Sequence, residues 1–150
     1  MHFKTLFKSI AYSMLFFFLL FSLLAESKLS IYIKKYNKTA KFEVEIADTK
    51  ILRKKGLMFR SKLEKEKGML FIFPNEQIIR MWMKNTMIPL DILFISKDKV
   101  IVDIIENAKE MSDNILISKT KSKYVLEINS GLVKDFNITI GDSINFEKTR

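Results

Sequence analysis

The stretch Gly68–Ser96 restricts the fold more than any other part of the chain, because its apolar residues come in runs of strand length. Met69–Phe73 is a continuous apolar run closed by Pro74 and Asn75, which is typical of a strand covered on both faces. A second run, over residues 90–96, is largely apolar apart from Asp91 and Ser96 and follows another proline. These two runs predict short strands at the centre of the chain.

Residues 78–84 lie between the two runs and alternate in character. Successive side chains of a strand point to opposite faces of its sheet. One set is apolar and predicts a face packed in the core: Ile79, Met81 and Met83. The other set predicts a face that is open to solvent or to a ligand: Ile78, Arg80, Trp82 and Lys84.

Two elements are expected ahead of this centre. Residues 42–46 alternate between apolar and charged side chains, as a half-buried strand does. Asp48 or Thr49 can cap a helix that ends at Gly56. The expected apolar face of this helix is Ile51 and Leu52. An irregular segment follows over residues 57–67, and its expected inward anchors are Leu57, Met58, Phe59 and Leu63.

Further short elements are expected after the centre. They are a hairpin partner at 100–105, a loop at 106–120 with at most a short strand at 115–117, a strand at 124–128, a helical turn ending near Phe136, and a last strand at 143–146. The order lacks a strand–helix–strand rhythm. It predicts a mainly β fold at the border of α+β: a compact, mostly antiparallel, small β-barrel-like domain with one or two short helices over residues 41–147.

The chain ahead of this domain divides into two parts. Residues 28–40 are interpreted as a basic spacer, although Ile31 and Ile33 leave an edge strand open. Residues 1–27 have the layout of a secretory signal peptide, since lysines precede an apolar run at 10–25. The run is shorter than the ~20 residues that cross a bilayer comfortably. We therefore expect an exported protein of the periplasm or cell envelope. The alternative is an uncleaved N-terminal anchor, with membrane association through residues 10–25.

The composition argues against several classes of site. The chain has no cysteine, and its single histidine, His2, lies in the segment expected to be removed. The expected mature domain therefore lacks imidazole and thiolate groups for catalysis or metal binding. Five methionines could suggest a thioether copper site: Met69, Met81, Met83, Met87 and Met111. Without His or Cys beside them, Met81 and Met83 instead predict core packing. We expect no cofactor and no metal.

The formal net charge of +9 could attract nucleic acid, anionic lipid or an acidic ligand. The lysines are scattered along the chain instead of clustering with aromatic residues, as a nucleic-acid groove requires. We expect a monomer without a nucleic-acid partner.

Five segments, taken in order, carry a resemblance to a known family: RKKGLMFRSKL (Arg53–Leu63), GMLFIFP (Gly68–Pro74), MWMKNTMIPLDILFI (Met81–Ile95), YVLEINSG (Tyr124–Gly131) and ITIGDSINF (Ile138–Phe146). Together they resemble the domain-of-unknown-function 192 family, also called uncharacterised protein family 0127, over roughly residues 41–147. The resemblance implies a compact β-rich domain, often exported, with no assigned reaction. Family members often carry a proline in the loop after residues 100–105, where this chain has Lys109, Glu110 and Met111.

The candidate binding residues follow one another along the centre of the chain: Arg80, Trp82, Lys84, Asn85, Thr86 and Asp91. An aromatic plate between two cations could hold a ligand whose carboxylate or phosphate pairs with the cations. We interpret the protein as a non-catalytic module for an anionic small ligand or an envelope partner, and we assign no catalytic residue. Two alternatives stay open. One is an envelope hydrolase or lyase with Asp91 or Glu127 as acid or base; the other is a purely structural module, in which Lys84 pairs with one of these carboxylates.

Overall fold

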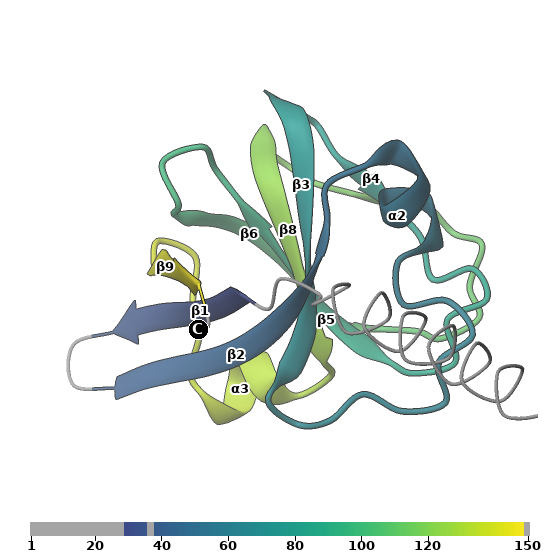
Figure 1. Cartoon of the computed structure of the whole chain (residues 1–150), viewed down its shortest axis with the longest axis horizontal. Helices are drawn as coiled ribbons and strands as arrows, with labels where there is room; N and C mark the ends of the chain where they lie inside the picture. The colour runs from purple at the N-terminus through teal and green to yellow at the C-terminus, as the bar shows by residue number, and fades with distance from the viewer. Residues whose placement is uncertain (1–28, 36–37, 149–150) are drawn as a thin grey trace, which may run out of the picture.

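The computed structural model describes residues 29–35 and 38–148 (Figure 1). The expected signal segment, residues 1–27, lies outside the described residues. Within them the chain forms nine strands and two short helices, which confirms the predicted mainly β fold. In chain order these are β1 (Leu29–Lys35), β2 (Lys38–Ala47), α2 (Lys50–Lys55), β3 (Lys67–Gln77), β4 (Arg80–Met81), β5 (Leu90–Ile95), β6 (Ile101–Ala108), β7 (Leu116–Ile117), β8 (Ser122–Asn129), α3 (Leu132–Asp135) and β9 (Ser143–Lys148).

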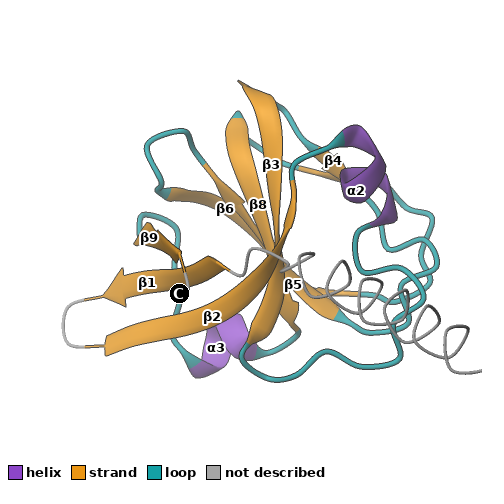
Figure 2. Ribbon diagram, in the orientation of Figure 1, coloured by secondary structure: helices purple, strands orange, loops and turns teal. Residues whose placement is uncertain are grey.

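Seven of these strands form one sheet in the order β6-β5-β8-β3-β2-β1-β9, and β4 pairs with β7 in a separate two-stranded sheet. Neighbours in the large sheet are antiparallel except β2 and β3, which are parallel. A parallel pair needs a crossover connection, and the segment that carries α2 provides it. The helix α2 therefore lies within this crossover instead of in a tight hairpin turn, and it is seen at the upper right in Figure 2.

The large sheet curls until its first and last strands approach each other. Val100, just ahead of β6, forms an isolated bridge with Ser143 of β9. The backbone N–H of Ile101 donates to the carbonyl of Asp142 at 2.9 Å, and the carbonyl of Ile101 accepts from the N–H of Gly141 at 2.8 Å. These contacts give the sheet the half-barrel form that the sequence predicted.

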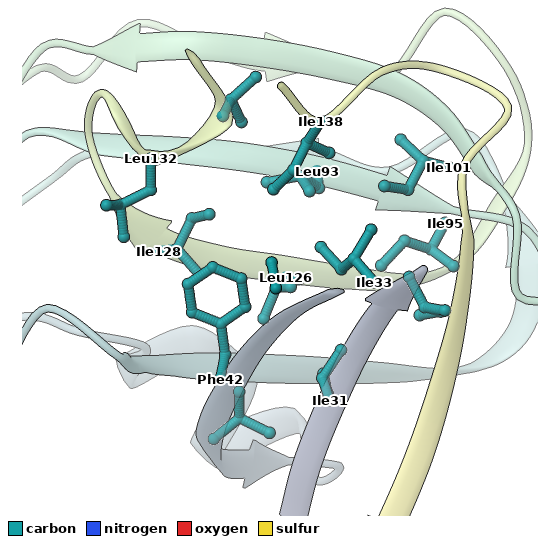
Figure 3. Close-up of a cluster of buried hydrophobic side chains, with 14 of the residues drawn as sticks. Ile31, Ile33, Phe42, Leu93, Ile95, Ile101, Leu126, Ile128, Leu132 and Ile138 are labelled. Carbon is teal, nitrogen blue, oxygen red and sulfur yellow. The ribbon is translucent and has the colours of Figure 1, made fainter. Parts of the chain in front are cut away.

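Alternate side chains of the central strands enter two buried hydrophobic clusters. Leu126 and Ile128 of β8 belong to the cluster inside the curl, together with Phe42 of β2 (Figure 3). Val125, on the opposite face of β8, belongs to the second cluster, which includes buried residues of β4 and of the loops around it. All six residues of β5, including Asp91, are buried, and the strand lies within the predicted range 90–96.

The helix signals in the sequence are confirmed by α2. The Thr49 hydroxyl accepts a hydrogen bond from the N–H of Leu52 at 3.2 Å, and Gly56 ends the helix with a φ of 48°. A positive φ is readily adopted by glycine, so this ending depends on the residue type. The expected apolar face is wrong, however, because α2 buries none of its residues and Ile51 is 80% exposed.

Three other expectations differ from the structure. The segment interpreted as a basic spacer contains β1, which pairs with both β2 and β9 and buries Ile31 and Ile33. β3 continues past Pro74, because its pairing with β8 shifts register between Ile72 and Gln77 and leaves the proline without a ladder partner. The predicted strand over 78–84 is reduced to the two residues of β4.

Phe59 is a further difference, since it was expected to point inward and is 70% exposed. Its φ is 64°, and its backbone N–H donates to the carbonyl of Asn85 at 2.8 Å. The backbone of this turn is therefore held against the turn at Asn85, while the phenyl ring is directed outward. Leu57, two residues earlier, is buried as predicted.

Candidate ligand-binding site

The described part of the chain has a surface hollow of about 270 Å³ between α2, β3 and β4. Five basic residues line it, four of them from α2: Lys50, Arg53, Lys54, Lys55 and Arg80. The other side chains that matter for binding are three aromatic residues and two polar ones: Phe71, Phe73, Trp82, Thr86 and Glu127. The hollow therefore combines a basic border with aromatic walls and a single carboxyl group.

The position of α2 over the hollow depends on close packing at its C-terminal end. A Cβ atom at Gly56 would lie 3.2 Å from Cζ of Phe71, which is closer than side chains normally pack. The basic residues of the last turn suit this end of a helix, because cations there face the negative end of the helix dipole. Glycine thus lets the basic turn lie directly beside the ring of Phe71.

Arg53 is held in place by contacts of its own. Nη1 donates to the carbonyl of Ile72 at 2.6 Å and also to the carbonyl of Asp48. The guanidinium carbon lies 5.1 Å from the centre of the Phe73 ring. These contacts engage one nitrogen of the guanidinium and one of its faces, so a planar donor group is fixed at the border of the hollow.

Trp82 and Arg80 follow from the alternation around β4. Ile79, Met81 and Met83 are buried as predicted, so the intervening residues are directed outward and line the hollow. Trp82 is 37% exposed, which leaves part of the indole surface open to contact. An exposed aromatic face beside cations is a surface on which a ring or an apolar group can stack.

Glu127 lies at the buried end of the hollow. It occupies β8 between Met69 of β3 and Ile92 of β5, and it is only 3% exposed. Burial raises the pKa of its carboxyl group from 4.5 to about 8. Within the described residues, no hydrogen bond or ion pair satisfies this carboxyl group, whose side chain lines the hollow.

The predicted site residues are only partly brought together. Arg80, Trp82 and Thr86 line the hollow. Lys84 points along its outside: Nζ lies 6.0 Å from the Trp82 ring centre and 3.6 Å from Oδ1 of Asp113. Asn85 serves the turn, with a φ of 54° and a carbonyl that accepts from the Phe59 backbone.

Asp91 is placed elsewhere and has a structural environment. Its side chain is fully buried, Oδ1 accepts from the N–H of Asn107 at 2.9 Å, and Oδ2 accepts from the N–H of Val133 at 2.9 Å. The carboxylate thus joins the end of β6 and the start of α3 to β5. Both oxygens are engaged with backbone, and neither lines the hollow.

The sequence reasoning missed the contribution of α2 to the site. Its Arg53–Lys54–Lys55 run was not among the predicted binding residues, because basic residues are expected in the last turn of any helix. No local signal connects that turn with Arg80 or Glu127, because the connection depends on the crossover between β2 and β3. No group of three or more potential ligands among His, Cys, Asp and Glu is assembled in the described part of the chain.

The fold and the hollow together define a small half-barrel domain with a basic, aromatic surface hollow. The chain belongs to the DUF192 family, described as "Uncharacterized ACR", whose family model matches residues 32–146. It is similar to the crystal structure of a protein of unknown function from Novosphingobium aromaticivorans, with 34% identity and a TM-score of 0.76 over 79% of this chain and 84% of that one. A protein from Sinorhizobium meliloti described as a candidate transcription regulator is 37% identical, with a TM-score of 0.78 over 82% of this chain and 96% of that one. No curated protein matches the chain.

Proposed function

We propose that this domain is a non-catalytic binding module that takes a small ligand with an anionic group in the hollow beside α2. The observation that carries the proposal is the basic border around an open aromatic wall. Arg53 is already oriented by backbone and ring contacts, and Arg80 makes no ion pair among the described residues. A phosphate or carboxylate between them would receive charge-assisted hydrogen bonds.

The test is binding of phosphate monoesters and short carboxylates, measured by thermal shift and calorimetry. Arg80→Ala should weaken binding about tenfold, because a hydrogen bond between charged groups contributes ~1.5–3 kcal/mol. Lys134→Ala on α3 is the matched control, since it removes one exposed positive charge outside the hollow. Equal affinities of the two variants would count against the proposed site.

An acid–base reaction at Glu127 is the competing function. Asp91 is the weaker candidate of the two carboxylates, since backbone N–H groups occupy both its oxygens. Turnover of a bound compound that disappears in Glu127→Gln, with binding retained, would favour an enzyme.

We do not propose DNA binding from the likeness to the Sinorhizobium protein. The described helices have six and four residues, which is short for a helix that reads the major groove.

We also propose that the protein is exported and that the end of the domain around the hollow contacts the membrane of the cell envelope. All but one of the exposed large hydrophobic residues in the described part come from three segments, 51–59, 78–87 and 111–117. Hydrogen bonds join these segments: Phe59 N–H to Asn85 carbonyl at 2.8 Å, and Met111 N–H to Thr86 carbonyl at 2.9 Å. Lysines and arginines outnumber acidic residues on the same segments. Apolar side chains among cations suit the surface of an anionic bilayer. No helix in the described residues is long and apolar enough to cross a membrane.

This orientation is testable through the single tryptophan of the chain. Brominated lipids in anionic vesicles should quench Trp82 when the full chain is bound, and Phe59→Ser should reduce that quenching. Ile140→Ser is the matched control, because Ile140 is exposed on a different part of the domain. Strong vesicle binding without quenching of Trp82 would contradict the proposed orientation and would leave residues 10–25 as the membrane contact.

A further inference from the structure

The hollow has opposite electrical character at its two ends. Its border carries five cationic side chains from α2 and β4. Its buried end carries the carboxyl group of Glu127, the only acidic side chain among the lining residues. Burial raises the pKa of Glu127, and none of these cations is a cause of the shift. The acid and the basic border therefore lie at different ends of one site.

Among the described residues, Glu127 has no hydrogen-bond or ion-pair partner that would offset the cost of its burial. Its neighbours across the strands are Met69 and Ile92, which are apolar, and the nearest cation along its own strand is Lys123, four residues earlier. Buried carboxyl groups are normally hydrogen-bonded, and buried charges are normally paired. A carboxyl group that lines an open hollow without such a partner is available to a ligand.

We infer that the ligand is amphoteric: its anionic group lies among the cations at the border, and an ammonium group on the same molecule pairs with Glu127. This inference rests on the proposed anion site and adds a second contact to it. An ammonium group supplies the positive charge and the N–H donors that the protein does not supply to this carboxylate. The anionic group of the same ligand offsets the repulsion that the basic border would exert on an ammonium group alone.

The class of ligand is thus a short molecule with an amine at one end and a phosphate or carboxylate at the other. A neutral ligand group, such as a hydroxyl, would also reach Glu127 by hydrogen bonding, but it would bind the protonated carboxyl group and supply no counter-charge to a carboxylate. Because Glu127 is protonated near pH 7 in the empty site, pairing with an ammonium group displaces its proton. Binding of the amphoteric class should therefore release a proton from the protein, whereas an uncharged group would not require it.

Three probes that differ only at one end separate these cases: phosphoethanolamine, 2-hydroxyethyl phosphate and ethyl phosphate. Calorimetry on the full chain at pH 7 should give the tightest binding for phosphoethanolamine, about tenfold tighter than for ethyl phosphate. In Glu127→Gln this preference should be lost, while the affinity for ethyl phosphate stays within about twofold. Titrations in two buffers of different ionisation enthalpy should show release of about one proton with phosphoethanolamine in the wild type only.

The outcomes distinguish the inference from the proposed function beneath it. If ethyl phosphate binds and Arg80→Ala weakens it, but phosphoethanolamine binds no tighter, the anion site stands and the ammonium contact is refuted. If 2-hydroxyethyl phosphate equals phosphoethanolamine, the contact is hydrogen bonding to a neutral group and the amphoteric class is refuted. If none of the three probes binds, both the inference and the anion site are overturned.

Discussion

Glu127 should make the folded protein less stable as the pH rises, which is opposite to the effect of most carboxylates. Replacement by glutamine should remove this pH dependence. Glutamine has nearly the same size as a protonated glutamate and cannot ionise. Burial raises the pKa of Glu127 from 4.5 to about 8, so between these values the folded chain holds a proton that the unfolded chain releases. The wild-type protein is therefore most stable at or below pH 4.5 with respect to this group, and it loses that stability as the pH rises toward 8.

The magnitude follows from the shift. Each pH unit in this window costs about 1.4 kcal/mol of unfolding free energy when one proton is involved. Between pH 5 and pH 7 the wild type should lose roughly 3 kcal/mol more than Glu127→Gln. Above pH 8 the carboxyl group is ionised in both states, and the difference between the two proteins should become constant.

Urea denaturation of both proteins at pH 5, 6, 7 and 8.5, followed by Trp82 fluorescence, measures this difference. Other titrating groups affect both proteins alike, so the comparison isolates Glu127. Any loss from the new amide group is independent of pH and shifts the whole curve without changing its slope. Parallel stability curves for wild type and variant would refute the unpaired, buried state of this carboxyl group. They would also remove the support that it gives to an ammonium-binding site.

Three further substitutions test the fold around the site by urea denaturation. Gly68→Ala should destabilise the domain by about 1–3 kcal/mol, because a Cβ there would lie 2.6 Å from the backbone carbonyl oxygen of Glu127 and must displace a central strand; unchanged stability would mean that β3 and β8 are not packed this closely. Asp91→Asn should cost about 2 kcal/mol through weakened hydrogen bonds to buried backbone, and it should leave ligand affinity unaltered, since Asp91 lies outside the hollow. Loss of binding with full stability would instead return Asp91 to the site. Thr49→Ala should cost about 1 kcal/mol through loss of the cap on Leu52, while Thr49→Ser should retain most of it.

The local patterns of the chain predicted much of the fold. The hairpin of β5 and β6, the helix between Thr49 and Gly56, and the burial of alternate residues near β4 all depend on neighbours within a few positions. The basic segment at β1 was harder to interpret. Its weak alternation does not show whether a strand is paired on one side or on both, because that depends on distant strands. Phe59 was misplaced for a related reason: its exposure follows from a turn held by the distant Asn85 carbonyl.

The candidate site was predicted only in part. The positions of Arg80 and Trp82 were predicted from the alternation of residues 78–84. Thr86, four residues after Trp82, lines the same hollow. Asp91 is equally close in sequence, yet β5 directs its carboxylate to backbone groups of β6 and α3. Sequence proximity therefore could not separate a residue that lines the hollow from one that holds the strands together.

The sequence by itself determined where most of the strands lie, where α2 begins and ends, and that the chain resembles a family that the family model then confirmed. These features are encoded in side-chain period, capping residues and ordered motifs, all of which are local. Only the tertiary structure decided that the basic turn of α2 meets Arg80 and Trp82 around a hollow that the buried Glu127 also lines. This arrangement depends on the parallel pairing of β2 with β3 and on the place of β8 beside β3. Contacts between residues so far apart along the chain leave no periodic pattern in the amino-acid sequence.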